Sequence, residues 1–417
     1  MGGTFDMAVA RRKATNPAKR IGVLVLNPGG PGASGVRMAV GAKDLFSAEV
    51  QERYDLVGFD PRGIAGSTQV RCSGEVIGRK PRDFPRNQAE FDELVAYNRE
   101  LREDCRKWTG PLFDHVDTLS VVEDMDALRK ALGEKKISYY GVSYGTLIGQ
   151  QYAQRYGANL RGMVLDSVMD HGLNAKDMAA SAAAGAEDSF AEFARWCATD
   201  AACALHGKPV AQQWKDFLTA SDRGELLEFG SIPISPEYAI GRAYSAFIRV
   251  EWQQFATWMS ELRIGTAPTE RPAARGIGTQ AHGRFAVFCQ DWSMRPASYE
   301  DLRRTADAER AAAPAMRFSP ELREAMLDCA GWPPPTNPSA TTVLAPTTPT
   351  IMVANARHDP STPYAWATGA YKQMRERAVL HTYDGWGHGV YHRGQCNRAA
   401  IDAYLLGGPP RDATCGG

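Results

Sequence analysis

The pentapeptide Gly141-Val142-Ser143-Tyr144-Gly145 constrains this chain more than any other feature of its sequence. It follows a β-rich run at residues 137–140 and precedes a helix-like run that begins at Thr146. Small residues two positions before and two after a serine permit a tight, strained turn in which neighbouring backbone leaves no room for a Cβ atom. Such a turn exposes the serine hydroxyl above a sheet edge, at the positive end of the following helix. The context therefore predicts that Ser143 is an activated nucleophile.

The rest of the chain predicts a mostly parallel α/β sheet with a helical insertion. Short, continuous apolar runs alternate with helical patterns, which is typical of parallel strands covered on both faces. Residues 120–123 have the pattern of a capping box, which predicts that a helix begins at Ser120. In the middle of the chain, helical segments rich in Ala, Trp and Phe replace the alternating pattern. We therefore expect the first part of a core at residues 1–170, a helical cap at 171–346, and the C-terminal part of the core at 347–417.

Charge and hydropathy exclude several classes of protein. The chain has 48 Lys and Arg against 48 Asp and Glu, so its formal net charge is zero. It has no basic run and no basic–aromatic stripe, which argues against a nucleic acid or an anionic membrane as partner. No stretch approaches the roughly 18 apolar residues that span a bilayer. No His/Cys cluster has the spacing of a metal site, and no pattern indicates a cofactor.

The cysteines predict structural disulfides. An even number, scattered over loop-like segments, is typical of an oxidising compartment, whereas unpaired thiols in a cytosolic enzyme are the alternative. Spacing does not fix the connectivity, but short loops favour two pairs and leave two others: Cys197–Cys203 and Cys396–Cys415, then Cys72–Cys105 and Cys289–Cys329. The chain begins within a strand-like run and without an apolar leader. We therefore expect a truncated start, with any export signal either removed or encoded upstream.

Two loops after later strand-like runs supply the partners that a serine nucleophile needs. Asp359 follows the run that ends at Asn355, and His388 stands between two glycines after the last such run. Binding sites in open α/β sheets lie at the carboxyl ends of the strands, so both side chains are expected near Ser143. The order serine, aspartate, histidine is that of α/β-hydrolases. The rival residues are the histidines His358, His381 and His392, and the acids Asp166 and Asp384.

The glycine loop after the first core strand is suited to stabilising an oxyanion. Residues 27–32 read Asn-Pro-Gly-Gly-Pro-Gly, so side chains do not obstruct the N–H groups of Gly29 and Gly30. The second donor is expected from the N–H of Tyr144, the residue after the nucleophile. A phosphate-binding loop is the alternative, but the two prolines remove donors and no Lys-Ser/Thr follows. The loop therefore favours acyl-transfer chemistry.

Five segments together carry a resemblance to a known family. They are Asn27-Pro28-Gly29-Gly30-Pro31-Gly32, Phe59-Asp60-Pro61-Arg62-Gly63, residues 140–146, residues 359–364 and Gly387-His388-Gly389. These segments resemble the secreted tripeptidyl aminopeptidases, which are prolyl-aminopeptidase-like α/β-hydrolases with a C-terminal TAP-like region. The resemblance covers essentially the whole chain and is weakest in the cap. It implies an α/β-hydrolase fold, a triad of Ser143, Asp359 and His388, and extracellular release of short peptides from free N-termini.

An exopeptidase needs a negative group that holds the α-ammonium of its substrate. We favour Asp291, because the neighbouring Cys289 and Trp292 could fix it, and we expect Asp291 and Trp292 to line the substrate pocket. A solvated or helix-capping carboxylate is the alternative for each acidic residue of the cap. The other candidates are Glu187, Asp188, Glu237 and Glu251.

The sequence thus predicts a secreted serine exopeptidase that releases tripeptides or similarly short units through an acyl-enzyme. A carboxylesterase or lactonase acting on a small acyl substrate, for example in secondary metabolism, is the alternative within catalysis. A hydrolase-fold binding protein without catalysis is the alternative from another class, and the filled triad positions argue against it.

Overall fold

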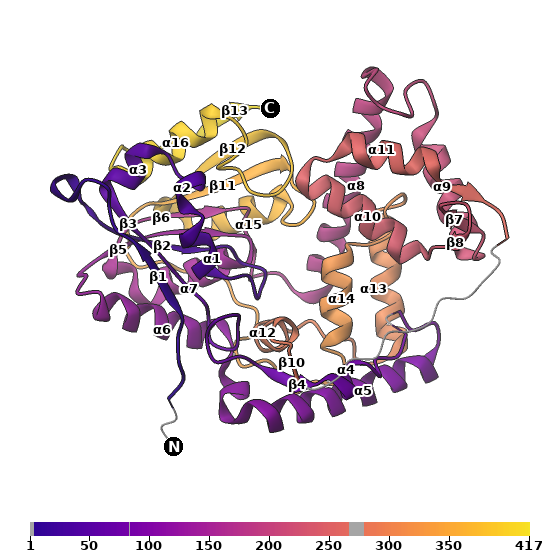
Figure 1. Cartoon of the computed structure of the whole chain (residues 1–417), viewed down its shortest axis with the longest axis horizontal. Helices are drawn as coiled ribbons and strands as arrows, with labels where there is room; N and C mark the ends of the chain where they lie inside the picture. Colours follow the sequence, from indigo (N-terminus) through magenta and orange to yellow (C-terminus); the bar gives the residue numbers. More distant parts are fainter. Residues whose placement is uncertain (1–3, 83, 267–278) are drawn as a thin grey trace.

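The computed structural model describes residues 4–82, 84–266 and 279–417. Figure 1 shows a sheet flanked by helices, with a second group of helices beside it. Residues 1–3, where the sequence predicts that the chain begins within a strand, lie outside the described ranges, and the first strand observed is β1 (Val9–Arg12). No helix in the described ranges is long and apolar enough to cross a membrane.

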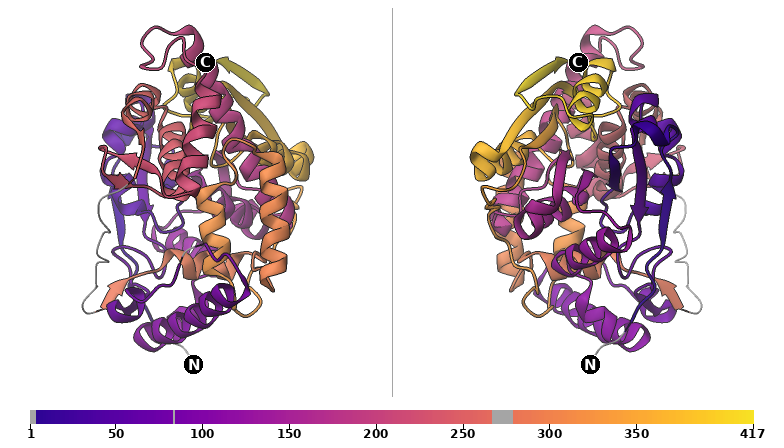
Figure 2. Two further views of the ribbon diagram at one scale, coloured as in Figure 1. Left: turned by 90° about the vertical axis from the view of Figure 1, so that its right-hand side faces the viewer. Right: turned by 90° about the vertical axis from the view of Figure 1, so that its left-hand side faces the viewer.

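An eight-stranded sheet forms the centre of the core. Its strands lie in the order β1-β3-β2-β5-β6-β11-β12-β13, and every neighbouring pair is parallel except β1 and β3. In Figure 2 the indigo N-terminal strands and the yellow C-terminal strands accordingly lie at opposite edges. The predicted mostly parallel α/β sheet is confirmed. Its other strands are β2 (Gly22–Asn27), β3 (Tyr54–Phe59), β5 (Ile137–Val142), β6 (Leu160–Asp166), β11 (Ile351–His358), β12 (Ala378–Trp386) and β13 (Ala413–Gly416).

Helices cover both faces of this sheet, because successive residues of a strand point to opposite sides. In β2, Val23 and Val25 pack with α6, α7 and α15, whereas Leu24 and Leu26 pack with α1, α2, α3 and α16. The helices on the first face are α6 (Thr118–Ala131), α7 (Tyr144–Tyr156) and α15 (Tyr364–Met374). Those on the second face are α1 (Gly35–Val40), α2 (Ala42–Leu45), α3 (Ala48–Arg53) and α16 (Gln395–Leu405).

The predicted start of α6 is wrong, since the helix begins at Thr118 rather than at Ser120. Asp117 is the N-cap, and its carboxylate accepts hydrogen bonds from the N–H of Ser120 at 3.0 Å and from the Ser120 hydroxyl at 2.9 Å. Ser120 therefore receives the cap instead of providing it.

The chain between β6 and β11 carries the cap helices, which fall into two packing groups. Helices α8 to α11 share an apolar cluster that includes Phe193, Trp214 and Phe247. Helices α12 and α14 share a second cluster with the first part of α8 and with α5 (Gln88–Thr109) and α7 of the core, through residues such as Phe288 and Leu147. The inserted helices are α8 (Ala175–Thr199), α9 (Val210–Asp222), α10 (Pro236–Arg249), α11 (Trp252–Glu261), α12 (Arg284–Asp291), α13 (Tyr299–Ala312) and α14 (Pro320–Asp328).

Smaller elements connect these parts. β7 (Leu226–Glu228) pairs with β8 (Ile232–Pro233) and β9 (Arg263–Ile264) within the insertion. β10 (Thr279–Ala281) pairs antiparallel with β4 (Arg71–Ser73) of the core. The insertion is thus joined to the core by backbone hydrogen bonds as well as by side chains. The remaining short elements are α4 (Gly74–Ile77) and the 3-10 turns η1 (Pro17–Lys19), η2 (Gly110–His115), η3 (Gly157–Asn159) and η4 (Arg375–Arg377).

Four disulfides join the eight cysteines in the pairs that the sequence favours. Cys289–Cys329 matters most for the site, because it links α12 to the residue after α14. The other pairs are Cys72–Cys105, Cys197–Cys203 and Cys396–Cys415.

Candidate active site

Ser143 lies in the turn between β5 and α7. Its backbone has φ 58° and ψ −126°, a strained conformation for a residue other than glycine. The glycines on either side make this turn possible. A Cβ on Gly141 would lie 2.6 Å from the carbonyl oxygen of Gly145, and a Cβ on Gly145 would lie 2.7 Å from that of Asn27. The structure therefore has the strand–turn–helix geometry predicted for the pentapeptide.

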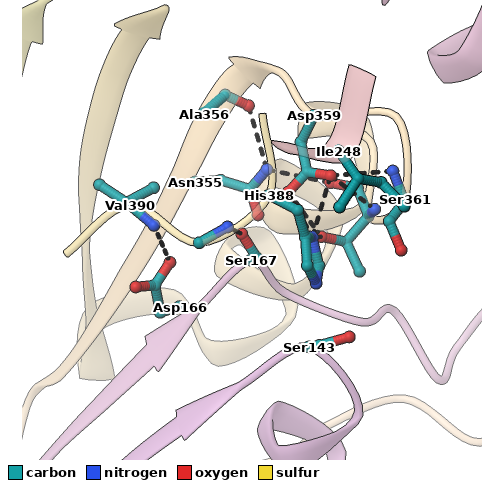
Figure 3. A network of polar contacts seen from close by, with 12 residues as sticks. Ser143, Asp166, Ser167, Ile248, Asn355, Ala356, Asp359, Ser361, His388 and Val390 are labelled. Carbon is teal, nitrogen blue, oxygen red and sulfur yellow. Dashed lines mark hydrogen bonds and ion pairs between the residues drawn. The ribbon is translucent and has the colours of Figure 1, made fainter. Parts of the chain in front are cut away.

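Asp359 and His388 lie together at the carboxyl ends of β11 and β12 (Figure 3). Nδ1 of His388 lies 2.9 Å from Oδ2 and 3.1 Å from Oδ1 of Asp359. The Asp359 carboxylate is 1% exposed, and it also accepts hydrogen bonds from the N–H of Ser361 and from the N–H and hydroxyl of Thr362. These donors fix the carboxylate in the orientation that holds the imidazole.

The imidazole of His388 lies between Asp359 and Ser143 and points toward Ser143 (Figure 3). Nδ1 faces the carboxylate, so Nε2 is the nitrogen available to the serine side. No hydrogen bond between Ser143 and His388 is drawn in this network. In substrate-free enzymes such bonds are often long and tighten when substrate binds. The structure thus brings the three predicted residues to one place and orders them as hydroxyl, imidazole and carboxylate.

The glycine loop packs directly against the serine turn. A Cβ on Gly29 would lie 2.4 Å from the carbonyl oxygen of Val142 and 2.7 Å from the nitrogen of Tyr144. The N–H of Gly29 donates to Oδ1 of Asn27 at 2.9 Å, so it is not free to bind an oxyanion. Gly30 and Tyr144 line a cavity together with Ser143, which leaves their N–H groups as the candidate donors. The expectation for Gly29 is therefore corrected, and its part is to allow the close approach of the two loops.

Comparisons with known proteins show the family of this chain. Residues 313–415 match the family model described as TAP-like protein. Serine protease Hip1 of Mycobacterium tuberculosis is 32% identical over 99% of this chain and 84% of its own length. The chain belongs to the TAP-like family of serine hydrolases.

Further relatives of this TAP-like hydrolase carry different names. The tripeptidyl aminopeptidase of Streptomyces coelicolor is 28% identical over 95% of this chain and 77% of its own. Carboxylesterase B of Mycobacterium tuberculosis is 32% identical over 99% and 83%. A solved α/β-hydrolase fold protein from Chitinophaga pinensis has 12% identity, 97% and 94% coverage, and a TM-score of 0.43. The predicted family is confirmed, while the names of the relatives include both peptidases and an esterase.

The rival histidines and acids of this TAP-like hydrolase are engaged elsewhere. His358 faces Asp188 on α8 at 2.7 Å, and Nε2 of the buried His381 bonds with Asn397. Asp384 pairs with Arg357 at the surface. Of the remaining rivals, His392 is exposed, and the Asp166 carboxylate holds backbone N–H groups of the loop that follows His388.

Asp291 and Trp292 lie beneath the serine turn instead of facing a substrate pocket. The Asp291 carboxylate is 0% exposed and accepts hydrogen bonds from the N–H and hydroxyl of Thr118, the hydroxyl of Tyr144 and the amide of Asn337. Burial raises the pKa of Asp291 to about 6. Trp292 is fully buried, and its indole N–H donates to the same Tyr144 hydroxyl. With these donors in place, Asp291 cannot hold a substrate amine, and both residues support Tyr144 from below.

Three of the other acidic candidates for holding an amine also have partners, among them Asp188 with His358, whereas Glu237 lines two cavities that Ser143 does not line. Glu187 accepts from the N–H groups of Ala315 and Met316, and Glu251 is exposed beside Arg249. Within the described ranges, Asp188, Glu192 and His358 are the group whose side-chain atoms could together hold a metal ion, all within 4.8 Å of one another. No step of the chemistry at Ser143 needs a metal there.

Glu321 is a site residue that the sequence did not single out. It lies at the start of α14 and lines the cavity that also contains Ser143, Tyr144 and Gly30. Its Oε2 accepts hydrogen bonds from the hydroxyl of Tyr244 at 3.1 Å and of Ser361 at 2.8 Å. Its sequence context, an acid in the first turn of a helix, is so common that it carries no functional signal.

Proposed function

We propose that this TAP-like hydrolase is a serine exopeptidase in which Ser143, His388 and Asp359 form the catalytic triad. Ser143 attacks the scissile carbonyl while His388 takes its proton through Nε2, and Asp359 fixes the tautomer and stabilises the imidazolium. The N–H groups of Gly30 and Tyr144 stabilise the oxyanion of the tetrahedral intermediate. His388 then gives the proton to the leaving amine, and water hydrolyses the acyl-enzyme by the same steps. The hydrogen-bonded His388–Asp359 pair beside the strained Ser143 supports these roles.

The carboxylate of Glu321 is the observation that favours an aminopeptidase. Two hydroxyls hold its Oε2, whereas its Oε1 forms a long ion pair with Arg284 at 3.8 Å and accepts no hydrogen bond from that side chain. A fixed carboxylate with one oxygen open to the cavity of Ser143 is suited to an α-ammonium group. When Glu321 holds the α-ammonium group of a peptide, a carbonyl close to the peptide's N-terminus lies at the hydroxyl of Ser143. We further infer that the released units are tripeptides, because a relative is named tripeptidyl aminopeptidase.

Glu321→Gln is expected to lower kcat/KM for free-amino peptides by about 10- to 100-fold, the effect of losing a charge-assisted hydrogen bond. N-acetylated peptides and p-nitrophenyl esters lack the ammonium and should be cleaved as before, measured at a pH where His388 is neutral. Glu324→Gln is the matched control, because Glu324 is on the same helix and lies 3.7 Å from the same Arg284. Equal losses on peptide and ester would show that Glu321 does not recognise the amine.

The pH dependence follows from the surroundings of His388. Burial alone lowers the pKa of His388, but the charge and hydrogen bond of Asp359, with the charges of Glu321 and Asp166, raise it above the ordinary 6.5. The base must be neutral, so kcat/KM falls as the pH drops through this raised pKa. A pH profile with an ester substrate measures it without titration of the substrate. A limb centred below 6.5 would contradict the prediction.

A carboxylesterase is the second candidate. The cavity at Ser143 has apolar walls that include Met169, Phe288 and Leu322, and such walls also suit a small acyl group. Mass spectrometry of digests of unmodified and N-acetylated peptides separates the two activities. Cleavage near free N-termini alone supports the peptidase, and no cleavage of either set supports the esterase.

We also propose that the protein acts outside the cytosol. Its four disulfides are the supporting observation, because such bonds persist in oxidising compartments. Cell fractionation with an antibody tests this, and recovery of the protein from the cytosol alone would contradict it.

A further inference from the structure

Asp166, the last residue of β6, contacts both loops that carry the reacting groups. Its carbonyl oxygen accepts a hydrogen bond from the N–H of Ser143 at 2.9 Å. Its carboxylate accepts a hydrogen bond from the N–H of Val390 at 2.7 Å (Figure 3). It also accepts one from the N–H of Tyr391 at 3.1 Å, and both residues come just after His388. One residue therefore touches the nucleophile turn through its backbone and the histidine loop through its side chain.

The following residue extends this contact. The hydroxyl of Ser167 accepts a hydrogen bond from the N–H of Gly389 at 2.8 Å. Three successive N–H groups after His388 are thus held by the end of β6. The loop needs such support, because Gly387 and Gly389, with φ of 91° and 84°, flank the histidine and restrain the backbone little.

Burial of the Asp166 carboxylate has a cost that its surroundings offset in part, since burial still raises the pKa of Asp166 above its ordinary value. The carboxylate is 0% exposed, and an isolated charge at such a depth would be strongly destabilising. The two N–H groups and the hydroxyl of Tyr140, at 2.7 Å, provide the compensating donors. An apolar residue of similar size would fill the space but could not hold the two N–H groups of the histidine loop.

We propose that Asp166 is a positioning residue that sets the imidazole of His388 against the hydroxyl of Ser143. It does not touch the substrate. It fixes the histidine loop relative to the serine turn, and its negative charge lies near the imidazole. The inference rests on the proposed roles of Ser143 and His388, but not on the choice between peptide and ester substrates.

The two effects of Asp166 can be measured separately. Loss of the acceptors loosens the loop, which lowers kcat. Loss of the charge lowers the pKa of His388, because Asp359, Glu321 and Asp166 are the negative groups that raise it. The acid limb of the pH profile should then move to lower pH. A residue that only stabilised the fold would lower the stability and leave this limb in place.

Asp166→Asn is the test variant, because it keeps the size of the side chain but removes the charge and replaces one acceptor by a donor. With a p-nitrophenyl ester, we expect kcat to fall by about 10- to 100-fold, the effect of a displacement on the order of 1 Å at a catalytic group. KM should change little, and the acid limb of the pH profile should move to lower pH. Asp170→Asn is the matched control, since Asp170 is a buried carboxylate on the following loop that accepts hydrogen bonds from Gly172 and Gln373. It should match the wild type.

Labelling of Ser143 by a fluorophosphonate separates this inference from the proposed function. If the wild type does not label, the proposed function fails. If the wild type labels and a folded Asp166→Asn enzyme labels and turns over equally fast, or if Asp170→Asn loses as much activity, the inference is overturned. If Asp166→Asn does not fold, Tyr140→Phe removes one donor from the carboxylate instead. A smaller loss of kcat with unchanged KM then supports the inference, and an unchanged kcat overturns it.

Discussion

Ser143→Ala is expected to lower kcat on the order of 10⁶-fold for peptides and esters alike, as in other serine hydrolases. The hydroxyl is the attacking group, so its removal prevents formation of the acyl-enzyme. Thermal unfolding should be unchanged, because the substitution removes one hydroxyl and leaves the glycines that allow the turn in place. Steady-state kinetics and a melting curve measure both quantities.

A double variant provides the internal control for this prediction. Because Ser143 and His388 act as a unit, adding His388→Ala to Ser143→Ala should cost almost nothing further. Turnover by Ser143→Ala at the wild-type rate would end the assignment of the nucleophile. A large additional loss in the double variant would show that the two residues act independently.

Asp359→Asn is expected to lower kcat by about 10⁴-fold, with folding preserved. The amide would present an N–H donor or a weaker acceptor to Nδ1 of His388, which favours the wrong tautomer and withdraws the charge that stabilises the imidazolium. Kinetics on an ester substrate, together with circular dichroism, test this directly.

Asp384→Asn is the matched control for this variant. Asp384 is also a carboxylate at the end of the C-terminal half of the sheet, but it pairs with Arg357 at the surface. Its replacement should leave kcat unchanged. If Asp384→Asn and Asp359→Asn lost activity equally, the choice of Asp359 as the acid would be wrong.

The parts of the site that depend on local chain geometry could be predicted from the sequence. A Cβ atom on either glycine beside Ser143 would clash with backbone atoms, so the glycine–serine pattern is sufficient to predict the turn. Asp359 and His388 each follow a strand of a parallel sheet, and the carboxyl ends of such strands share one edge. The alternation of strands and helices, together with the order of the residues along the chain, was therefore enough to predict that these three residues lie close together.

The parts that depend on packing between distant segments could not be predicted. From the sequence, we expect Asp291 to be an acid that a disulfide holds in a substrate pocket. In the structure, α12 packs against α7 of the core, and this packing buries the Asp291 carboxylate under Tyr144. In the sequence, Glu321 is an ordinary acidic residue in the first turn of a helix. Its orientation is fixed by hydrogen bonds from Tyr244 and Ser361, which the sequence does not reveal. These contacts join residues that are far apart in the sequence.

The same distinction explains the correction in the glycine loop. The sequence shows that Gly29 and Gly30 are unobstructed, but it does not show where each N–H points. In the folded loop, Asn27 takes the N–H of Gly29, and Gly30 remains beside Ser143 in the cavity. The hydrogen bond between Asn27 and Gly29 therefore decides which glycine N–H remains available, and no rule of composition or spacing predicts this bond.

Peptide mass spectrometry after fluorophosphonate labelling tests the central claim most directly, because the probe reacts only with a serine that a neighbouring base activates. The account predicts a single adduct on Ser143, lost in Ser143→Ala and formed far more slowly in His388→Ala. An adduct on another serine, or labelling of Ser143 that does not depend on His388, would contradict it.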